Sequence, residues 1–273
     1  MNIDIKNARE LIQQADAILI TAGAGIGVDS GLPDFRGDEG FWKAYSPIEK
    51  LGLNFSEMAN QKLFIDNPKL VWAFYGHRLD LYRKTIPHDG FRMLLDLTKK
   101  KNDNYFIFTS NVDGQFQKAG FSEDKICEIH GSIHHFQCTK YISHGIWNAE
   151  YENITVDMDN FQALNLPICK ICGELARPNI LMFSDFGWKA SRMLNQKEKF
   201  NRWIKQNRLK KMVIIEIGAG TAIPTVQVYG DQLAKKLSGA NLIRINPYDY
   251  HAEKKLGIGL PMGALDGIKA LLE

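Results

Sequence analysis

The sequence has few cysteines, little net charge and no long hydrophobic run, and each absence excludes a class of protein. Four cysteines among 273 residues are too few for a disulfide-stapled secreted scaffold. A formal net charge of +3 gives no reason to expect nucleic acid or an anionic membrane as a partner. No apolar run reaches the ~20 residues that a membrane span needs, and the polar start MNIDIKNARE lacks the layout of a signal peptide. We therefore expect a cytoplasmic globular protein.

Apolar segments that alternate with helix-like segments predict an α/β fold built on a doubly wound parallel sheet. Helical spacing occurs near 4–15 and at 91–100, 224–237 and 263–272. The strand-like runs are AILIT, NYFIFTSN, KMVIIEIGAG and NLIRIN. Because ligands of open α/β sheets bind at the carboxyl ends of the strands, the candidate site loops are those after three of these runs, at 22–37, 109–113 and 218–224.

Two segments interrupt this alternation. Residues 38–85 are rich in aromatic side chains and helical spacing but contain no clear strand, and residues 132–176 are irregular and hold three of the four cysteines. We expect both segments to pack together as a smaller domain. The predicted large, Rossmann-like domain then comprises residues 1–37, 86–131 and 177–273.

The first candidate loop, GAGIGVDSGLPDFRG, combines a glycine-rich turn with charged residues. Glycines after a strand let backbone N–H groups approach phosphate oxygens closely. The spacing is not that of the common dinucleotide fingerprint, because Val28 replaces its last glycine and no acid-tipped second strand follows about 20 residues later. A hydride-transferring dehydrogenase is therefore disfavoured. The DFRG tail suits contacts with a ribose, a flat ring and a phosphate, or is a surface loop with a weak Asp34–Arg36 ion pair.

Five short motifs follow one another in a characteristic order: GAGIGVDSGLPDFRG at 23–37, TSNVD at 109–113, IHGS at 129–132, GAGTA at 218–222 and RIN at 244–246. This ordered set resembles the sirtuin family of NAD-dependent protein deacylases, whose pattern is a GAG loop ending in PDFR, then TQNxD, HG, GTS and IN. The resemblance spans nearly the whole chain. It implies a Rossmann-like domain, a small domain with a helical module and a zinc-binding module, and NAD bound between the two domains.

The resemblance also implies a reaction on an acylated protein lysine. The acyl carbonyl oxygen attacks C1′ of the nicotinamide ribose, nicotinamide leaves, and O-acyl-ADP-ribose and lysine are released. His130 and Asn111 are the implied catalytic residues, with His130 as the general base, a task that suits the ordinary pKa of histidine. From the residues alone, alternatives stay open: His130 caps a strand end, and Asn111 and Asp113 are good helix N-caps.

The remaining cofactor contacts follow from the same resemblance, motif by motif. The first loop would face the phosphates and close over the reaction centre, with Phe35 as a shield, and the later loops would hold the nicotinamide amide, the riboses and adenine. The implied NAD contacts are Gly23, Ala24, Gly25, Asp34, Phe35, Arg36, Ser110, Asn111, Asp113, Gly218, Gly220, Thr221, Asn246, Pro247, Gly263 and Ala264.

Several positions depart from the family pattern. The family has serine, glutamine and serine at the positions of Gly27, Ser110 and Ala222. Each change removes a side-chain hydrogen bond to NAD that is worth on the order of 1 kcal/mol. The family's FGE appears as FSD, so Phe183 and Asp185 are the candidates for the substrate groove. These departures keep two alternatives open: an ADP-ribosyltransferase or NAD hydrolase on the same scaffold, and a non-catalytic module that binds NAD or ADP-ribose.

The segment that corresponds to the family's zinc-binding module departs most from the family pattern, which has two Cys-x-x-Cys pairs. The segment CKIC supplies one Cys-x-x-Cys pair, Cys169 and Cys172, which is half of a zinc signature. The other pair should begin at Cys138, but Tyr141 occupies the position of its second cysteine. A structural zinc ion on the three cysteines and a metal-free module both stay open, and His144 is the candidate for a fourth ligand.

Overall fold

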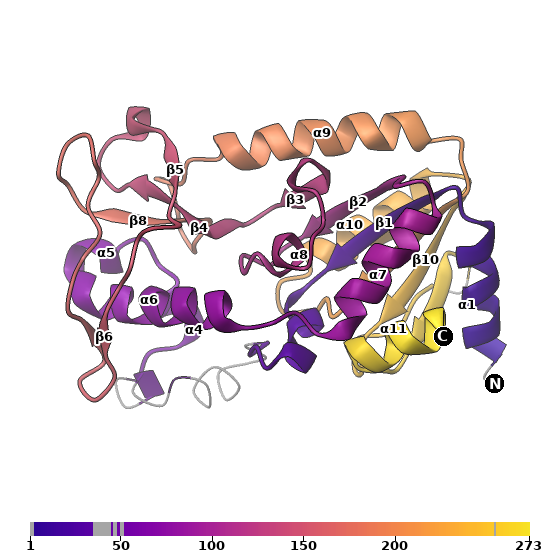
Figure 1. The fold of residues 1–273 in the computed structure, drawn as a ribbon, viewed down its shortest axis with the longest axis horizontal. Helices are drawn as coiled ribbons and strands as arrows, with labels where there is room; N and C mark the ends of the chain where they lie inside the picture. Colours follow the sequence, from indigo (N-terminus) through magenta and orange to yellow (C-terminus); the bar gives the residue numbers. More distant parts are fainter. Residues whose placement is uncertain (1–2, 35–44, 46–47, 50–51, 254) are drawn as a thin grey trace.

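The computed structural model describes residues 3–34, 45, 48–49, 52–253 and 255–273. A six-stranded sheet, in which every strand pair is parallel, organises one end of the molecule, with strand order β11-β10-β9-β1-β2-β3 (Figure 1). Its strands are β1 Ala17–Ala22, β2 Tyr105–Thr109, β3 Ile126–Glu128, β9 Met212–Ile217, β10 Ala240–Ile245 and β11 Gly257–Leu260. The predicted α/β fold with a parallel sheet is therefore confirmed.

Helices cover both faces of this sheet, which is why its central strands are mostly apolar. Every residue of β1 and β9 is buried. Alternate side chains serve opposite faces: Ile20 packs toward one set of helices and Leu19 toward the other. The first set is α1 Ile3–Gln14, α7 Asp89–Lys100 and α11 Ala264–Leu272, and the second is α9 Ser191–Asn207 and α10 Thr225–Lys236.

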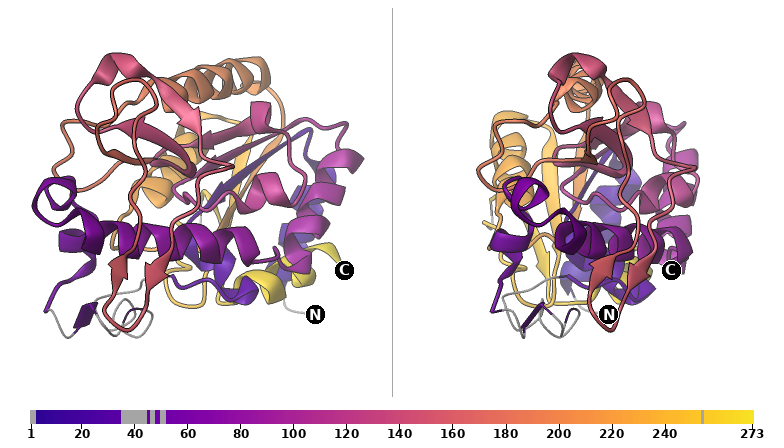
Figure 2. Two further views of the ribbon diagram at one scale, coloured as in Figure 1. Left: turned by 60° about the vertical axis from the view of Figure 1, so that its left-hand side comes forward. Right: turned by 90° about the vertical axis from the view of Figure 1, so that its left-hand side faces the viewer.

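A second hydrophobic core lies at the other end of the molecule, around α6 Pro68–Lys84. The aromatic residues of α6 meet those of an antiparallel sheet, and the rings of Trp72 and Phe136 lie 5.1 Å apart. The ribbon β6–β7 packs across the same helix (Figure 2). The elements are α4 Phe55–Met58, α5 Leu63–Asp66, β4 Gly131–Cys138, β5 Ile146–Asn148, β6 Val156–Asp157, β7 Gln162–Ala163 and β8 Ala176–Ile180.

The two predicted insertions thus share one core, although the exact domain boundaries stay a prediction. The sequence reading missed the eight-residue strand β4 in a segment that it expected to be irregular. Two adjacent histidines and a register shift between Ser132 and Phe136 break the alternation that would have revealed this strand. No helix in the described part of the chain is long and apolar enough to cross a membrane.

The two cores are joined where β3 runs almost directly into β4 (Figure 1). The residue that opens β4, Gly131, has φ +82°, and a Cβ there would lie 2.0 Å from the Asn179 oxygen. Only glycine fits this position. His130 therefore lies at the junction between the parallel sheet and the smaller unit. Further short helices in the described ranges are η1 Ala24–Ser30, α8 Gln115–Lys118, η2 Glu123–Lys125 and η3 Ile142–His144.

Candidate functional site

The three loops predicted from the sequence meet at the carboxyl ends of β1, β2 and β9. The N–H of Gly23 donates to the Ile217 oxygen at 3.0 Å, and the N–H of Gly25 donates to the Gly218 oxygen at 3.0 Å. From the other side, the Thr109 hydroxyl and the Ser110 N–H both donate to the Ala22 oxygen, at 2.9 and 3.2 Å. The first loop is therefore held between the other two by backbone hydrogen bonds.

The glycines of these loops are required by close packing of backbones. A Cβ on Gly23 would lie 2.7 Å from Ala219 Cα, and a Cβ on Gly25 would lie 2.7 Å from Gly218 Cα. Gly218 itself has φ +62°, a conformation that favours glycine. Because the N–H groups of Gly23 and Gly25 are used within the protein, the phosphate contact implied for this turn stays a prediction that needs other donors.

Asn111 is fixed against the first loop. Its Nδ2 donates to the Gly23 oxygen at 3.0 Å, and its backbone N–H donates to Thr109 Oγ1 at 3.0 Å. The side chain thus bridges two of the loops. This geometry supports a role at the site for Asn111 more than the alternative role as a helix cap.

Asp113 is a buried carboxylate just before α8. Its Oδ1 accepts from the Gln115 N–H at 2.9 Å, a cap-like contact that matches the alternative reading. Burial raises the pKa of Asp113 to about 6, although the Gln115 N–H opposes this shift. An ionisable group with so perturbed a pKa is typical of a functional site. A carboxylate is also a suitable acceptor for the amide N–H₂ of nicotinamide, so the residue fits the implied cofactor.

His130 is half-buried beside the TSN loop. Its backbone oxygen accepts from the Leu181 N–H at 2.9 Å, and the preceding Ile129 N–H donates to the Thr109 oxygen at 2.9 Å. Burial lowers the pKa of its imidazole, and a hydrogen bond to the backbone of Ser110 opposes this effect. The ring is therefore neutral at physiological pH, as a general base must be. Ser110 makes this contact through its backbone, so the missing family glutamine does not remove it.

The sequence reading did not single out His134 among the neighbouring histidines. Its Nε2 is 2.8 Å from the backbone oxygen of Asp113, and its ring would meet any Cβ placed on Gly114. No local pattern singled it out, because the alternation of buried side chains is broken in this part of the chain.

The residues predicted to hold the adenosine end are mostly engaged within the protein or exposed. Asn246 donates from Nδ2 to the Ala219 oxygen at 2.7 Å and accepts from the N–H groups of Tyr248 and Asp249. Asp29 of η1 accepts from the Leu265 N–H at 2.8 Å, which ties the start of α11 to the first loop. Ala264 is buried at that helix start, Gly263 is partly buried, and Gly220, Thr221 and Pro247 are exposed. Their contacts with NAD stay predictions.

Asp34 is exposed, and Phe35 and Arg36 lie outside the described residues. In the predicted substrate groove, Phe183 is 41% exposed and its N–H donates to the Ala59 oxygen at 2.9 Å. The Asp185 carboxylate is instead fully buried in a bidentate ion pair with Arg177, and it accepts from the Gly187 N–H at 3.1 Å. A role for Asp185 in the groove is therefore indirect: it holds the loop that presents Phe183.

The predicted metal ligands come together at the far side of the small unit. One ligand atom each from Cys138, His144, Cys169 and Cys172 lies within 4.8 Å of all the others. The Sγ atoms of Cys138 and Cys172 are 3.7 Å apart, close to the separation of about 3.8 Å that two thiolates have across a tetrahedral zinc ion. His144 Nδ1 is 3.4 Å from Cys169 Sγ. The geometry fits a three-cysteine, one-histidine structural zinc site, in which His144 replaces the missing cysteine.

Hydrogen bonds to the sulfur atoms of this cluster favour the thiolate form, which binds cations. The Tyr141 N–H donates to Cys138 Sγ at 3.4 Å. Burial raises the pKa of Cys169, but the N–H groups of Ile171 and Cys172 and the His144 side chain outweigh it and lower the pKa to about 6. A thiolate is the form that binds zinc.

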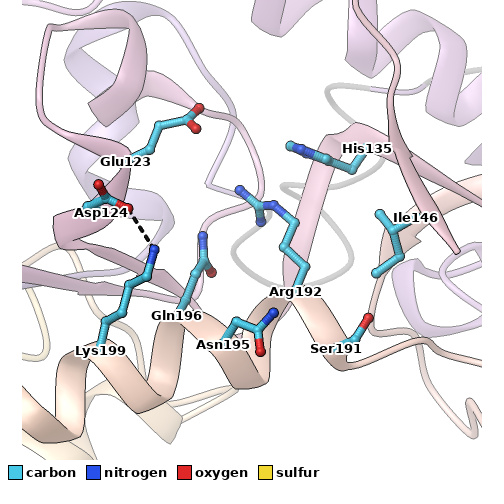
Figure 3. A pocket seen from close by; sticks show the side chains of 9 residues that line it. All are labelled: Glu123, Asp124, His135, Ile146, Ser191, Arg192, Asn195, Gln196 and Lys199. Carbon is cyan, nitrogen blue, oxygen red and sulfur yellow. Dashed lines mark hydrogen bonds and ion pairs between the residues drawn. The ribbon is translucent and has the colours of Figure 1, made fainter.

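A separate polar pocket of about 380 Å³ lies beside the start of α9 (Figure 3). The guanidinium of Arg192 extends into it, and Lys199 is paired with Asp124 at 2.6 Å. Behind the pocket, Arg192 pairs with the buried Glu128 at 2.5 Å. The pocket-lining residues do not include Asn111, Asp113 or His130, so this cavity is not the candidate active site.

Comparisons with known proteins agree with the geometry. The model of the Sir2 family matches residues 23–223. The NAD-dependent protein deacylase of Leptospira interrogans is 32% identical and that of Aquifex aeolicus is 29% identical, each over 89% of this chain and over 85% and 92% of those proteins. A crystal structure of a Sir2 homologue in complex with NAD superposes with a TM-score of 0.73 at 22% identity, over 99% of this chain and 93% of that one.

Proposed function

The chain belongs to the Sir2 family, and from this membership we propose that it is an NAD-dependent protein-lysine deacylase. Relatives that match most of this chain bear that name. The proposed substrates are NAD and an acylated lysine of a protein. We also propose a cytoplasmic setting, and the small net charge gives no reason to expect nucleic acid as a partner.

One arrangement carries the proposal. The imidazole of His130 is hydrogen-bonded to the backbone of Ser110, and the adjacent Asn111 donates to Gly23 of the first loop. A general base, an amide and a glycine turn from three distant motifs therefore meet at one place. A module that only binds NAD or ADP-ribose needs no base, so a histidine held beside Asn111 and the first loop favours an enzyme.

When NAD is bound, it supplies an electrophilic C1′ whose bond to nicotinamide breaks. The residues of this chain position the two substrates and accept a proton from a substrate hydroxyl. The imidazole of His130 is mainly neutral, so its free ring nitrogen can accept a proton from a substrate hydroxyl. Asn111 is held rigidly enough to orient a neighbouring group, since two loops fix it. Phe183 is exposed where an apolar lysine chain could pack against it.

The proposal is tested by incubating the protein with NAD, with and without acetyl- and other acyl-lysine peptides, and identifying products by mass spectrometry. O-acyl-ADP-ribose that forms only with peptide, and is lost in His130→Ala and Asn111→Ala, supports the deacylase. Free ADP-ribose without peptide would instead support the hydrolase, and ADP-ribose attached to protein would support the transferase. Saturable NAD binding without any product would overturn the enzyme proposal.

His135→Ala is the matched control for the histidine variant. His135 belongs to the adjacent strand β4, but its ring lines the separate pocket (Figure 3). We expect this variant to keep wild-type turnover. Thermal unfolding of all variants distinguishes a lost base from a lost fold.

A further inference from the structure

A buried lysine lies beside the cysteine–histidine cluster and bonds to the turn that carries its histidine. Lys189 is 5% exposed, and its Nζ donates to the backbone oxygens of Tyr141 and Gly145, at 2.8 and 3.0 Å. These two oxygens flank η3, which contains His144. Tyr141 in turn donates its N–H to Cys138. One ammonium group therefore holds both ends of the turn that replaces the second cysteine of the family pattern.

The charge of this ammonium needs a partner, because burying an unpaired charge is costly. Across the described ranges, no carboxylate forms a salt bridge with Lys189. Burial lowers the pKa of the Lys189 ammonium, and the acidic groups that oppose this effect are the thiols of Cys138, Cys169 and Cys172, which are negative once they bind a metal as thiolates. A divalent zinc ion with three thiolates and a neutral imidazole carries a formal charge of 2 − 3 = −1, which a single lysine balances.

We propose that Lys189 is a positioning residue for the metal site: it fixes the His144 turn and neutralises the zinc–thiolate cluster. The lysine is itself held rigidly. Its backbone N–H donates to Gln137 Oε1 at 3.0 Å, its oxygen accepts from Asn179 Nδ2 at 2.9 Å, and these two buried amides bond to each other at 2.9 Å. The backbone of Lys189 is therefore anchored on strands β4 and β8, and its side chain reaches from this fixed point to the turn.

The same segment links the metal site to the proposed substrate loop. Gln137 also bonds to the Gly187 oxygen at 2.8 Å, and the Gly187 N–H donates to the buried Asp185. Lys189 follows two residues later. These contacts do not involve the Lys189 ammonium, so the proposal concerns metal binding alone and does not depend on the proposed activity.

The test measures zinc affinity by competition with a chromophoric chelator, in Lys189→Met, Lys189→Gln and Lys189→Arg. We expect zinc to bind at least tenfold more weakly in Lys189→Met and Lys189→Gln, which lack the charge, and to bind near wild-type affinity in Lys189→Arg. The control is Lys140→Met, since Lys140 belongs to the same module but is exposed and paired with Glu174. That control should not change zinc affinity.

Cobalt substitution tests the positioning directly. A three-thiolate, one-imidazole site gives a characteristic visible spectrum, and in Lys189→Gln we expect its intensity to fall as His144 leaves the metal. Because Lys189→Gln removes the neutralising charge as well as the hold on the His144 turn, the double variant should bind zinc more weakly than His144→Ala alone, but by less than the two single losses combined. Unchanged zinc affinity in folded Lys189→Gln would overturn the proposal, as would a wild-type protein that binds no zinc. Should Lys189→Met fail to fold, Lys189→Gln still decides, because it keeps a donor for one of the two carbonyls.

Discussion

The buried carboxylate of Asp113 should lower the free energy of unfolding near neutral pH, and Asp113→Asn should therefore stabilise the protein. Burial raises the pKa of Asp113 from its ordinary value of 3.8 to about 6. A carboxylate whose pKa is raised in the folded state binds its proton more tightly there than in the unfolded chain. Folding is therefore penalised wherever the unfolded carboxylate is ionised. The difference of about 2 pKa units corresponds to about 3 kcal/mol.

The sign and the pH window follow from these two pKa values. Below pH 4 the carboxyl is protonated in both states, so Asp113→Asn should change stability little. Between pH 4 and pH 6 the wild-type protein loses stability relative to the variant, and above pH 6 the full difference of about 3 kcal/mol applies. Asparagine keeps an oxygen for the Gln115 N–H, so the local contact is preserved. NAD-dependent turnover should nevertheless fall.

The assay is urea unfolding of both proteins at a series of pH values from 4 to 7.5. Only the difference between them is interpreted, since the other titrating groups then cancel. Asp185→Asn serves as the contrasting variant: it removes one partner of a buried ion pair and should destabilise the protein by about 3–5 kcal/mol. If Asp113→Asn is less stable than wild type at pH 7.5, or if the difference does not grow between pH 4 and pH 6, the reasoning is refuted.

Three further substitutions test the packing around the site. Gly218→Ala should destabilise the protein by several kcal/mol, because the new Cβ meets backbone at 2.3 Å; a normal melting temperature would contradict this. Arg192→Met leaves the buried Glu128 unpaired and should cost about 3–5 kcal/mol, most of which Glu128→Gln in the same chain should restore in denaturant unfolding. In Gly27→Ser the new Cβ would lie 3.1 Å from the flexible Leu32 side chain, so the free energy of unfolding should change by only about 1 kcal/mol. This variant should lower the KM for NAD, and an unchanged KM would show that another group has replaced the family serine.

Much of the parallel sheet and the position of the candidate site followed from local patterns. The apolar runs AILIT and MVIIEI form buried strands, because a sheet covered on both faces needs largely hydrophobic segments. The polar loops after β1, β2 and β9 then had to meet at one edge of the sheet. Strand β4 escaped prediction because its histidines and its register shift hide the alternation of buried side chains.

Roles that depend on distant partners were not readable from the chain. The ion pair that buries the Asp185 carboxylate depends on Arg177, and the close packing of Gly25 in the first loop depends on Gly218. The predicted groove and phosphate roles of these residues stay predictions. In each case the deciding contact comes from a segment remote in sequence, so no local spacing encodes it.

By itself, the sequence determined the parallel α/β sheet and the order of the site loops, because periodicity and motif order act along the chain. The family resemblance of the motifs implied His130 as the candidate base. Only the tertiary structure decided that His144 completes the cysteine cluster, that Lys189 balances its charge and that Asp113 is buried enough to hold its proton to about pH 6. Distances and burial set these properties, and both arise only when remote segments pack together.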